Sequence, residues 1–372
     1  MLRAWTSWLV CLVIGLTISG SAASLSAAEP TVSPKEAEEM VTKAIDYLRT
    51  KGQKEDGSFS PQASPAVTSL VTTAILRHGR SPDDPVVAKS LKYIGGFIQP
   101  DGGIHTPDSK WKNYETCLAV LAFTEANKDG RYDATLKKAD AFLKGLQWDE
   151  TEEKGKDDPF FGGAGYGGSK RPDLSNTNFL IDALKATGNK ADSEAIQRAL
   201  VFVSRCQNLE TEHNTTPFAA KNPDGGFYYT PAGGGQSQAG PTEQGGLRSY
   251  GSMTYAGLKS MIYAGVKKDD PRVVAALKWL QKNYDLKQNP GMGDAGLFYY
   301  YNTIAKALSA LGEDTFKDDK GVAHNWRAEL LSELKSRQNA DGSWANANSK
   351  WMEGDANLVT GYALLTLSYL KK

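Results

Sequence analysis

One short turn returns four times along the chain. Its copies run from Gln53 to Phe59, Gln99 to Ile104, Pro223 to Phe227 and Gln338 to Trp344, and each contains an Asp-Gly pair. Each copy follows a one-faced amphipathic run and precedes a more apolar one. A unit that recurs in this way is typical of folds assembled from repeated supersecondary pieces. The sequence therefore predicts a repeated pair of elements, joined by this turn.

The segments before the turns are predicted to be amphipathic helices. Three begin with a capping residue followed by proline, at Ser33-Pro34, Asp84-Pro85 and Asp270-Pro271. Apolar residues then recur at helical spacing. Residues 83–94 and 269–280 match in type at most positions, which indicates internal duplication. Three further segments fit the same class: Tyr132 to Gln147, Asp192 to Gln207, and Trp326 to Arg337.

The segments after the turns are apolar or small on nearly every side. They are Thr68 to Arg77, Glu115 to Ala126, Ser175 to Thr187, Ser252 to Ala264, Leu297 to Leu311, and Ala356 to Leu370. Helices that are hydrophobic all round are buried. About six alternations of one-faced and buried helices predict an all-α fold, an α/α toroid of about six hairpins, with an open superhelix as the alternative. We expect residues 33–372 to form one such domain, with its glycine-rich loops over the N-termini of the inner helices.

The N-terminal segment has the features of a secretory signal. Arg3 precedes an apolar core from Trp8 to Thr17, and Ser26-Ala27-Ala28 offers a cleavage site, so residues 1–28 predict export to the periplasm or the medium. No later segment is apolar enough to span a membrane. Lysine plus arginine equals aspartate plus glutamate at 43 each, which argues against nucleic acid as a partner. Cys117 and Cys206 fall on apolar helical stretches and are expected to be buried free thiols, with a disulfide as the alternative.

The turn motif carries a family resemblance. The Gln-x-x-Asp-Gly-Ser-Trp pattern, intact at Gln338 to Trp344 and weaker at Gln53 to Phe59, resembles the repeat of squalene and oxidosqualene cyclases. Arg171 to Thr177, after a glycine-rich loop, is similar to the start of an inner helix in the terpenoid cyclase and protein prenyltransferase superfamily. The resemblance covers residues 33 to 372 and implies a toroid with a central cavity. More narrowly, the chain resembles exported proteins with prenyltransferase and squalene-oxidase repeats.

The chain departs from the chemistry of that superfamily. It lacks the Asp-x-Asp-Asp acid motif of squalene-hopene cyclases, and the carboxylates at its predicted inner-helix starts are single: Glu115, Asp173 and Asp355. A helix N-terminus favours the ionised form, so a lone aspartate there is a poor acid. These three are nevertheless the candidate catalytic residues, with helix capping as the alternative role for Asp355.

The zinc site of protein prenyltransferases has no convincing counterpart in this sequence. The nearest approximation combines Glu115, Cys117 and His105, and it lacks a matching third ligand on a downstream helix. We therefore predict neither a metal nor a cofactor.

Aromatic residues gather at the turns or first turns of the predicted inner helices. The candidate substrate-binding residues are Tyr250, Tyr255, Tyr299, Tyr300, Trp351, Arg248 and His105. In terpenoid cyclases such rings face cations, and here the alternative is packing between the two helix layers.

Three functions are compatible with these observations. The first is an exported squalene-cyclase-like or prenyltransferase-like protein that binds or transforms an apolar isoprenoid in an aromatic cavity. The second is a secreted carbohydrate-active enzyme, a polysaccharide lyase or glycosidase, which would need two opposed carboxylates such as Asp173 and Asp355. The third is a non-catalytic binding or scaffold protein, because a fold does not dictate a function. The lining of the central cavity distinguishes them.

Overall fold

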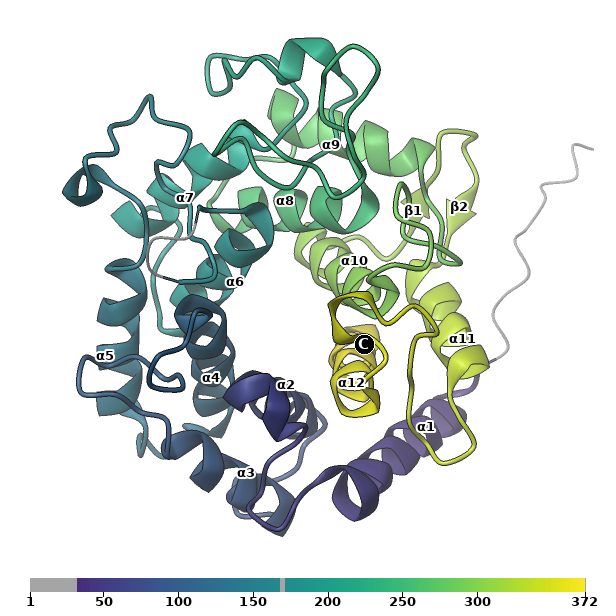
Figure 1. Ribbon diagram of the computed structural model, residues 1–372. Helices are drawn as coiled ribbons and strands as arrows, with labels where there is room; N and C mark the ends of the chain where they lie inside the picture. The colour runs from purple at the N-terminus through teal and green to yellow at the C-terminus, as the bar shows by residue number, and fades with distance from the viewer. Residues whose placement is uncertain (1–31, 168–170, 372) are drawn as a thin grey trace, which may run out of the picture.

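The computed structural model describes residues 32–167 and 171–371, and the predicted signal segment lies outside them. Twelve α-helices alternate between two layers (Figure 1). The outer layer consists of α1 (Pro34–Tyr47), α3 (Pro85–Gly95), α5 (Asp133–Lys144), α7 (Glu194–Arg205), α9 (Pro271–Lys282) and α11 (Trp326–Arg337). The inner layer consists of α2 (Ser64–Arg77), α4 (Lys112–Ala126), α6 (Leu174–Ala186), α8 (Gly251–Tyr263), α10 (Leu297–Leu311) and α12 (Ala356–Leu370).

The inner helices form a closed ring. Each packs against the next in chain order, and α12 packs against α2 to complete the circle (Figure 1). In the outer layer α1 contacts α11, so the first and last hairpins meet there as well. The predicted α/α toroid of six hairpins is therefore confirmed, and closure excludes the open superhelix.

Local sequence explains where the helices begin. Ser33 and Glu36 form a capping box at α1, and the side chains of Asp84 and Asp270 accept hydrogen bonds from the backbone of α3 and α9. In each of these three helices a proline occupies the first helical position, where no backbone N–H is needed.

A glutamine at the end of an outer helix joins consecutive hairpins. Its side-chain amide donates both to a glycine carbonyl in its own turn and to a carbonyl of the next outer helix. The four such pairs of acceptors are Gly57 and Val86 for Gln53, Gly162 and Ala195 for Gln147, Gly225 and Arg272 for Gln207, and Gly342 and Met40 for Gln338. Each of these four turns is thus fastened to its own glycine and to the following hairpin, whereas Gln99 donates to the Phe97 and His105 carbonyls within its own turn.

The turn glycines lie directly against that following helix. Gly57 and Gly342 both have φ of +91°, which favours glycine, and a Cβ on either would lie 2.4 Å from a carbonyl oxygen of the next outer helix, that of Lys89 or Lys43. A threonine of the inner helix completes the arrangement, because its Oγ1 accepts the backbone N–H that follows the turn, as in Phe59 to Thr68. The Asp-Gly turn therefore has a mechanical role between the layers.

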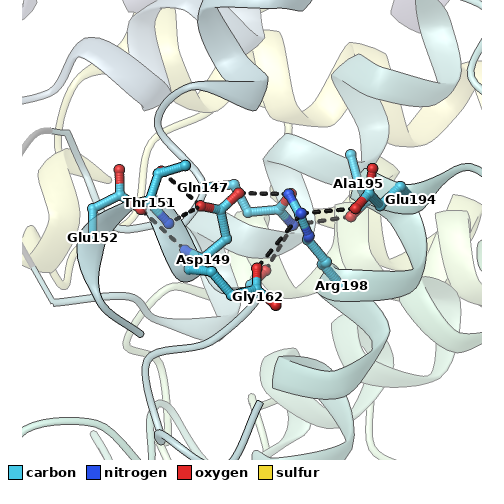
Figure 2. Close-up of polar contacts among 9 residues, drawn as sticks. Gln147, Asp149, Thr151, Glu152, Gly162, Glu194, Ala195 and Arg198 are labelled. Carbon is cyan, nitrogen blue, oxygen red and sulfur yellow. Dashed lines mark hydrogen bonds and ion pairs between the residues drawn. The ribbon is translucent and has the colours of Figure 1, made fainter. Parts of the chain in front are cut away.

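The connection that follows α5 makes the same glutamine contacts despite a long insertion. Figure 2 shows Gln147 reaching both Gly162 and Ala195 across the inserted segment. Asp149 in the insertion accepts from Thr151 and from Arg198 of α7. The insertion is consequently anchored to the outer layer.

The structure also contains two short strands. A two-stranded antiparallel hairpin, β1 (Phe316–Lys317) and β2 (Ala323–His324), precedes α11.

Cys117 and Cys206 are buried and free, as predicted, and burial raises the pKa of both thiols. Across residues 32–167 and 171–371, no helix has the length and apolar character needed to cross a membrane.

Candidate functional site

A cavity of about 350 Å³ occupies one end of the ring. It is bounded by the first turns of the inner helices and by the loops above them. The lining residues are Gln62, Ala63, Ser64, Ala66, Val67, Trp111, Tyr114, Tyr166, Ser175, Phe179, Tyr229, Gln238, Tyr250, Ser252, Met253, Gly296, Tyr299, Trp351, Met352, Glu353, Leu358 and Tyr362. Its size falls within the usual range for small-molecule sites.

Four aromatic side chains from four inner helices form a continuous wall. The rings of Tyr114 and Phe179 meet edge-on at 5.2 Å, Phe179 and Tyr299 are 6.1 Å apart, and Tyr299 meets Tyr362 at 5.9 Å. A hydrogen bond between Tyr362 and Tyr114 completes the circle. Ser175 and Tyr299 also share a hydrogen bond, of 3.1 Å between their hydroxyl oxygens. The wall is therefore fixed by ring packing and by hydroxyl contacts together.

The mouth of the cavity exposes large apolar side chains. Trp111, Trp351 and Met352 all line the cavity and are 52%, 43% and 42% exposed. Trp351 and Met352 also have positive φ angles of 56° and 65°, a conformation that costs free energy for residues other than glycine. The ring of Trp351 covers Gly296, where a Cβ would lie 3.0 Å from it. Strained backbone and exposed aromatic surface thus coincide at the entrance.

One carboxyl group belongs to the lining. Glu353 is 1% exposed and accepts hydrogen bonds from the backbone N–H of Tyr299, at 2.8 Å, and from Asn346 Nδ2, at 2.7 Å. Burial raises the pKa of this carboxyl, while these hydrogen bonds act in the opposite direction. Its position over the N-terminus of α10 also favours a negative charge.

A second carboxyl lies directly behind the aromatic lining. Asp173 caps α6 by accepting from the backbone of Asn176 at 2.9 Å, and Asn176 Nδ2 and the Tyr229 hydroxyl bond to the same carboxyl. Complete burial raises its pKa to about 6, and these hydrogen bonds together with the charge of Arg171 only partly offset that rise. Tyr166 bonds in turn to Tyr229, so the polar chain Tyr166–Tyr229–Asp173 leads from the cavity into the protein.

The other two candidate carboxylates make structural contacts. Asp355 caps α12 through the N–H groups of Asn357 and Leu358, and it also accepts from Ser60 and Gln62. Glu115 is fully buried away from the cavity lining, where it accepts from the Thr106 N–H and the Ser109 hydroxyl. The capping role considered for Asp355 is the one seen in the geometry.

The predicted binding residues fall into two groups. Tyr250, Tyr299 and Trp351 line the cavity. The rings of Tyr255 and Tyr300 pack against each other inside the core, with their centroids 5.8 Å apart, and the Tyr300 hydroxyl donates to the Asp285 carbonyl. Tyr300 is in the core while its neighbour Tyr299 lines the cavity, because consecutive positions on a helix point in different directions. The buried ring of His105 lies 5.5 Å from Phe142, and Arg248 lies in a separate surface hollow, where it donates to the Pro241 carbonyl. The last four residues thus lie outside the lining.

Several lining residues were not predicted from the sequence. Glu353 lies two residues before the favoured Asp355, and Tyr114, Tyr166, Phe179, Tyr229 and Tyr362 come from helices or loops whose rotation the sequence leaves open. A usable signal was present in the aromatic residues near several inner-helix starts, such as Tyr114 at the third position of α4.

A buried charged cluster lies deeper in the ring, toward the C-terminal ends of the inner helices. Asp182 on α6 pairs with Lys259 on α8 and with Lys306 on α10. Burial alone would raise the pKa of Asp182, but the two ammonium groups lower it to about 2; burial lowers the pKa of Lys259 to about 8. Both lysines are directed at the carboxylate and outside the cavity lining. Within the described part of the chain, no group of three or more His, Cys, Asp or Glu residues is placed to hold a metal ion.

Comparison with solved structures shows the fold alone. The chain is similar to a type II terpene cyclase, MstE from Scytonema, with a TM-score of 0.54 and 11% identity over 91% of this chain and 98% of that one. It is equally similar to a family 88 glycosyl hydrolase from Bacteroides vulgatus, with a TM-score of 0.54 and 9% identity over 90% and 98% of the two chains. A possible member of the GH105 family from Salmonella enterica gives a TM-score of 0.54 and 9% identity over 96% and 98%. No protein-family model and no curated protein matches the sequence.

Proposed function

We propose that this protein binds an apolar, isoprenoid-type ligand in the cavity at the end of the ring, and that any reaction on that ligand takes place there. The observation that supports this is the continuous wall of Tyr114, Phe179, Tyr299 and Tyr362. Aromatic rings offer large apolar contact areas and hold a chain without demanding matched hydrogen bonds. We also propose that this binding occurs outside the cytoplasm, and the signal-like features of residues 1–28 support that part of the proposal.

The carboxyl groups favour this function over glycoside hydrolysis. Glycosidases need two carboxyl groups on either side of the scissile bond. Glu353 is the one carboxyl in the lining described here, whereas Asp173 and Asp355 lie outside the lining and cap α6 and α12. Scaffolding without a ligand would not require an open cavity of about 350 Å³.

Binding is the part of the function that the geometry supports best. Protonation of an alkene requires a strong acid, and in a carboxyl pair a like-charged neighbour can keep one group protonated. Asp173 has no such neighbour among its bonded partners, which are Asn176 and Tyr229. A chemical step would need a proton donor of another kind.

Ligand binding by matched variants of one helix tests the proposal. Tyr362 lines the cavity, whereas Tyr369, two turns further along α12, bonds to Arg77 outside the lining. We expect farnesol to bind the purified protein in a calorimetric titration, Tyr362→Leu to weaken that binding about tenfold, and Tyr369→Leu to leave it unchanged. Binding of oligosaccharides in place of farnesol would support the glycosidase alternative and overturn the proposal.

A further inference from the structure

The charged side chains in the cavity lining and directly behind it are acidic. Among the described residues of the lining, Glu353 is the single carboxyl, and none is lysine, arginine or histidine. Asp173 adds a second buried carboxyl behind Tyr229. The hydrogen bonds of Glu353 come from neutral donors, the Asn346 amide and backbone N–H groups. The interior therefore carries negative charge that no bonded cation neutralises.

One nearby base contacts the lining: Lys350 Nζ lies 4.4 Å from the centroid of the Trp351 ring at the mouth, so that ring already has a cation over it. Three other bases do not change the balance inside the cavity. Arg171 lies close enough to influence Asp173, but its guanidinium bonds to Gln236 and it is only partly buried. Lys259 and Lys306 lie toward the opposite ends of α8 and α10, and both are paired with Asp182. None of these three belongs to the lining.

The aromatic side chains add to the same preference. The lining contains Trp111, Tyr114, Tyr166, Phe179, Tyr229, Tyr250, Tyr299, Trp351 and Tyr362. The face of an aromatic ring is the negative end of its quadrupole, and a desolvated cation over it gains about 2 kcal/mol. Such cages are typical of sites for quaternary ammonium groups, which cannot donate hydrogen bonds.

The buried carboxyl of Asp173 and the hydroxyl groups beside it also favour a positively charged ligand. The Tyr229 hydroxyl bonds to the carboxyl, and the Tyr166 hydroxyl bonds to Tyr229. When the carboxyl is ionised, the Tyr229 hydroxyl donates to it. A positive group in the cavity is stabilised by the ionised carboxyl, whereas an anionic group is repelled.

We propose that the cavity selects an amphiphilic organic cation, an isoprenoid-type chain that carries a tertiary or quaternary ammonium group, over neutral and anionic ligands with the same chain. This inference rests on the proposed function for the chain itself and adds the charge of its head group. The apolar wall holds the chain, and the aromatic rings with Asp173 and Glu353 hold the cation.

A matched series of three ligands tests the inference on the unmodified protein. Farnesyl trimethylammonium, the hydrocarbon in which a tert-butyl group replaces the ammonium, and farnesoic acid would be titrated calorimetrically at neutral pH. We expect the cation to bind about tenfold or more tightly than the hydrocarbon of the same shape, and the acid to bind most weakly. Asp173→Asn and Glu353→Gln should each reduce the preference for the cation about fivefold while leaving the affinity for the hydrocarbon unchanged.

Asp84→Asn is the matched control. Asp84 caps α3 in the outer layer by accepting from Val86, so this variant makes the same change of side chain far from the cavity and should keep the full preference. Equal affinity for the cation and the hydrocarbon would overturn the inference and leave the proposed function intact. Failure of all three ligands to bind would refute both. If Asp173→Asn does not fold, Glu353→Gln and the ligand series on the unmodified protein still decide the question.

Discussion

Asp173 serves both as a helix cap and as a buried charge, and these roles oppose each other in free energy. Its carboxyl accepts from the backbone of Asn176, which stabilises the start of α6. Burial raises its pKa from 3.8 to about 6, so the folded protein binds a proton there more tightly than the unfolded chain does. The stability that this proton supplies is complete below pH 3.8 and is lost as the pH rises through about 6.

Asp173→Asn should remove this loss of stability at higher pH, because the asparagine side chain carries no charge. Its amide oxygen can still accept the capping hydrogen bond. The difference of about two pH units between folded and unfolded states corresponds to about 3 kcal/mol. We therefore expect the variant to gain up to that amount in free energy of unfolding, relative to the unmodified protein, between about pH 4 and about pH 7. Urea unfolding of both proteins at about pH 4 and about pH 7 measures the difference in free energy of unfolding. The same difference at both pH values would contradict the raised pKa of Asp173.

At the scale of elements, the Asp-Gly turn is a joint between successive hairpins. Gly342→Ala should be much more destabilising than Gly79→Ala. Both glycines have positive φ, of +91° and +83°, but a Cβ at position 342 meets the Lys43 carbonyl oxygen at 2.4 Å, whereas one at position 79 meets nothing within 4 Å. We expect about 1 kcal/mol for Gly79→Ala, from the backbone conformation alone, and at least about 2 kcal/mol more for Gly342→Ala. Equal losses in urea unfolding would show that the turn does not bear on the next helix.

The boundaries of the helices could be predicted from the sequence, but the rotation of the inner helices could not. Helix boundaries followed from caps such as Asp270-Pro271 and from apolar spacing, because these signals are local. The rotation of an inner helix about its axis did not follow, since a helix that is apolar on all sides has no distinguished face. Tyr299 consequently reached the cavity while Tyr300 entered the core, and Glu353 joined the lining from a loop that a helical pattern does not describe.

At the scale of the whole molecule, the closing contacts join the two ends of the chain. Gln338 donates to the Met40 carbonyl, Lys51 pairs with Asp341, and Lys335 pairs with Glu36. The Gln338 contact repeats, between the last turn and α1, the bond that Gln53, Gln147 and Gln207 each make with the next outer helix, and the two ion pairs add to it. The ring thus has no structurally distinct seam, although the chain has two ends.

A circular permutant should therefore fold. Outer helices all lead toward the cavity end and inner helices return from it, so α1 begins at the same end of the ring at which α12 finishes. We expect a chain whose ends are joined by a glycine-serine linker, and which is opened between Lys128 and Asp129 in the exposed α4–α5 connection, to unfold cooperatively and to keep its ligand affinity. Opening the joined chain instead between Asp56 and Gly57 cuts a turn that is fastened to α3 through Gln53, and should abolish cooperative unfolding. Circular dichroism with urea distinguishes the two. Failure of the first permutant would show that the natural chain ends do form a distinct seam, and success of both would show that ring closure does not depend on this turn.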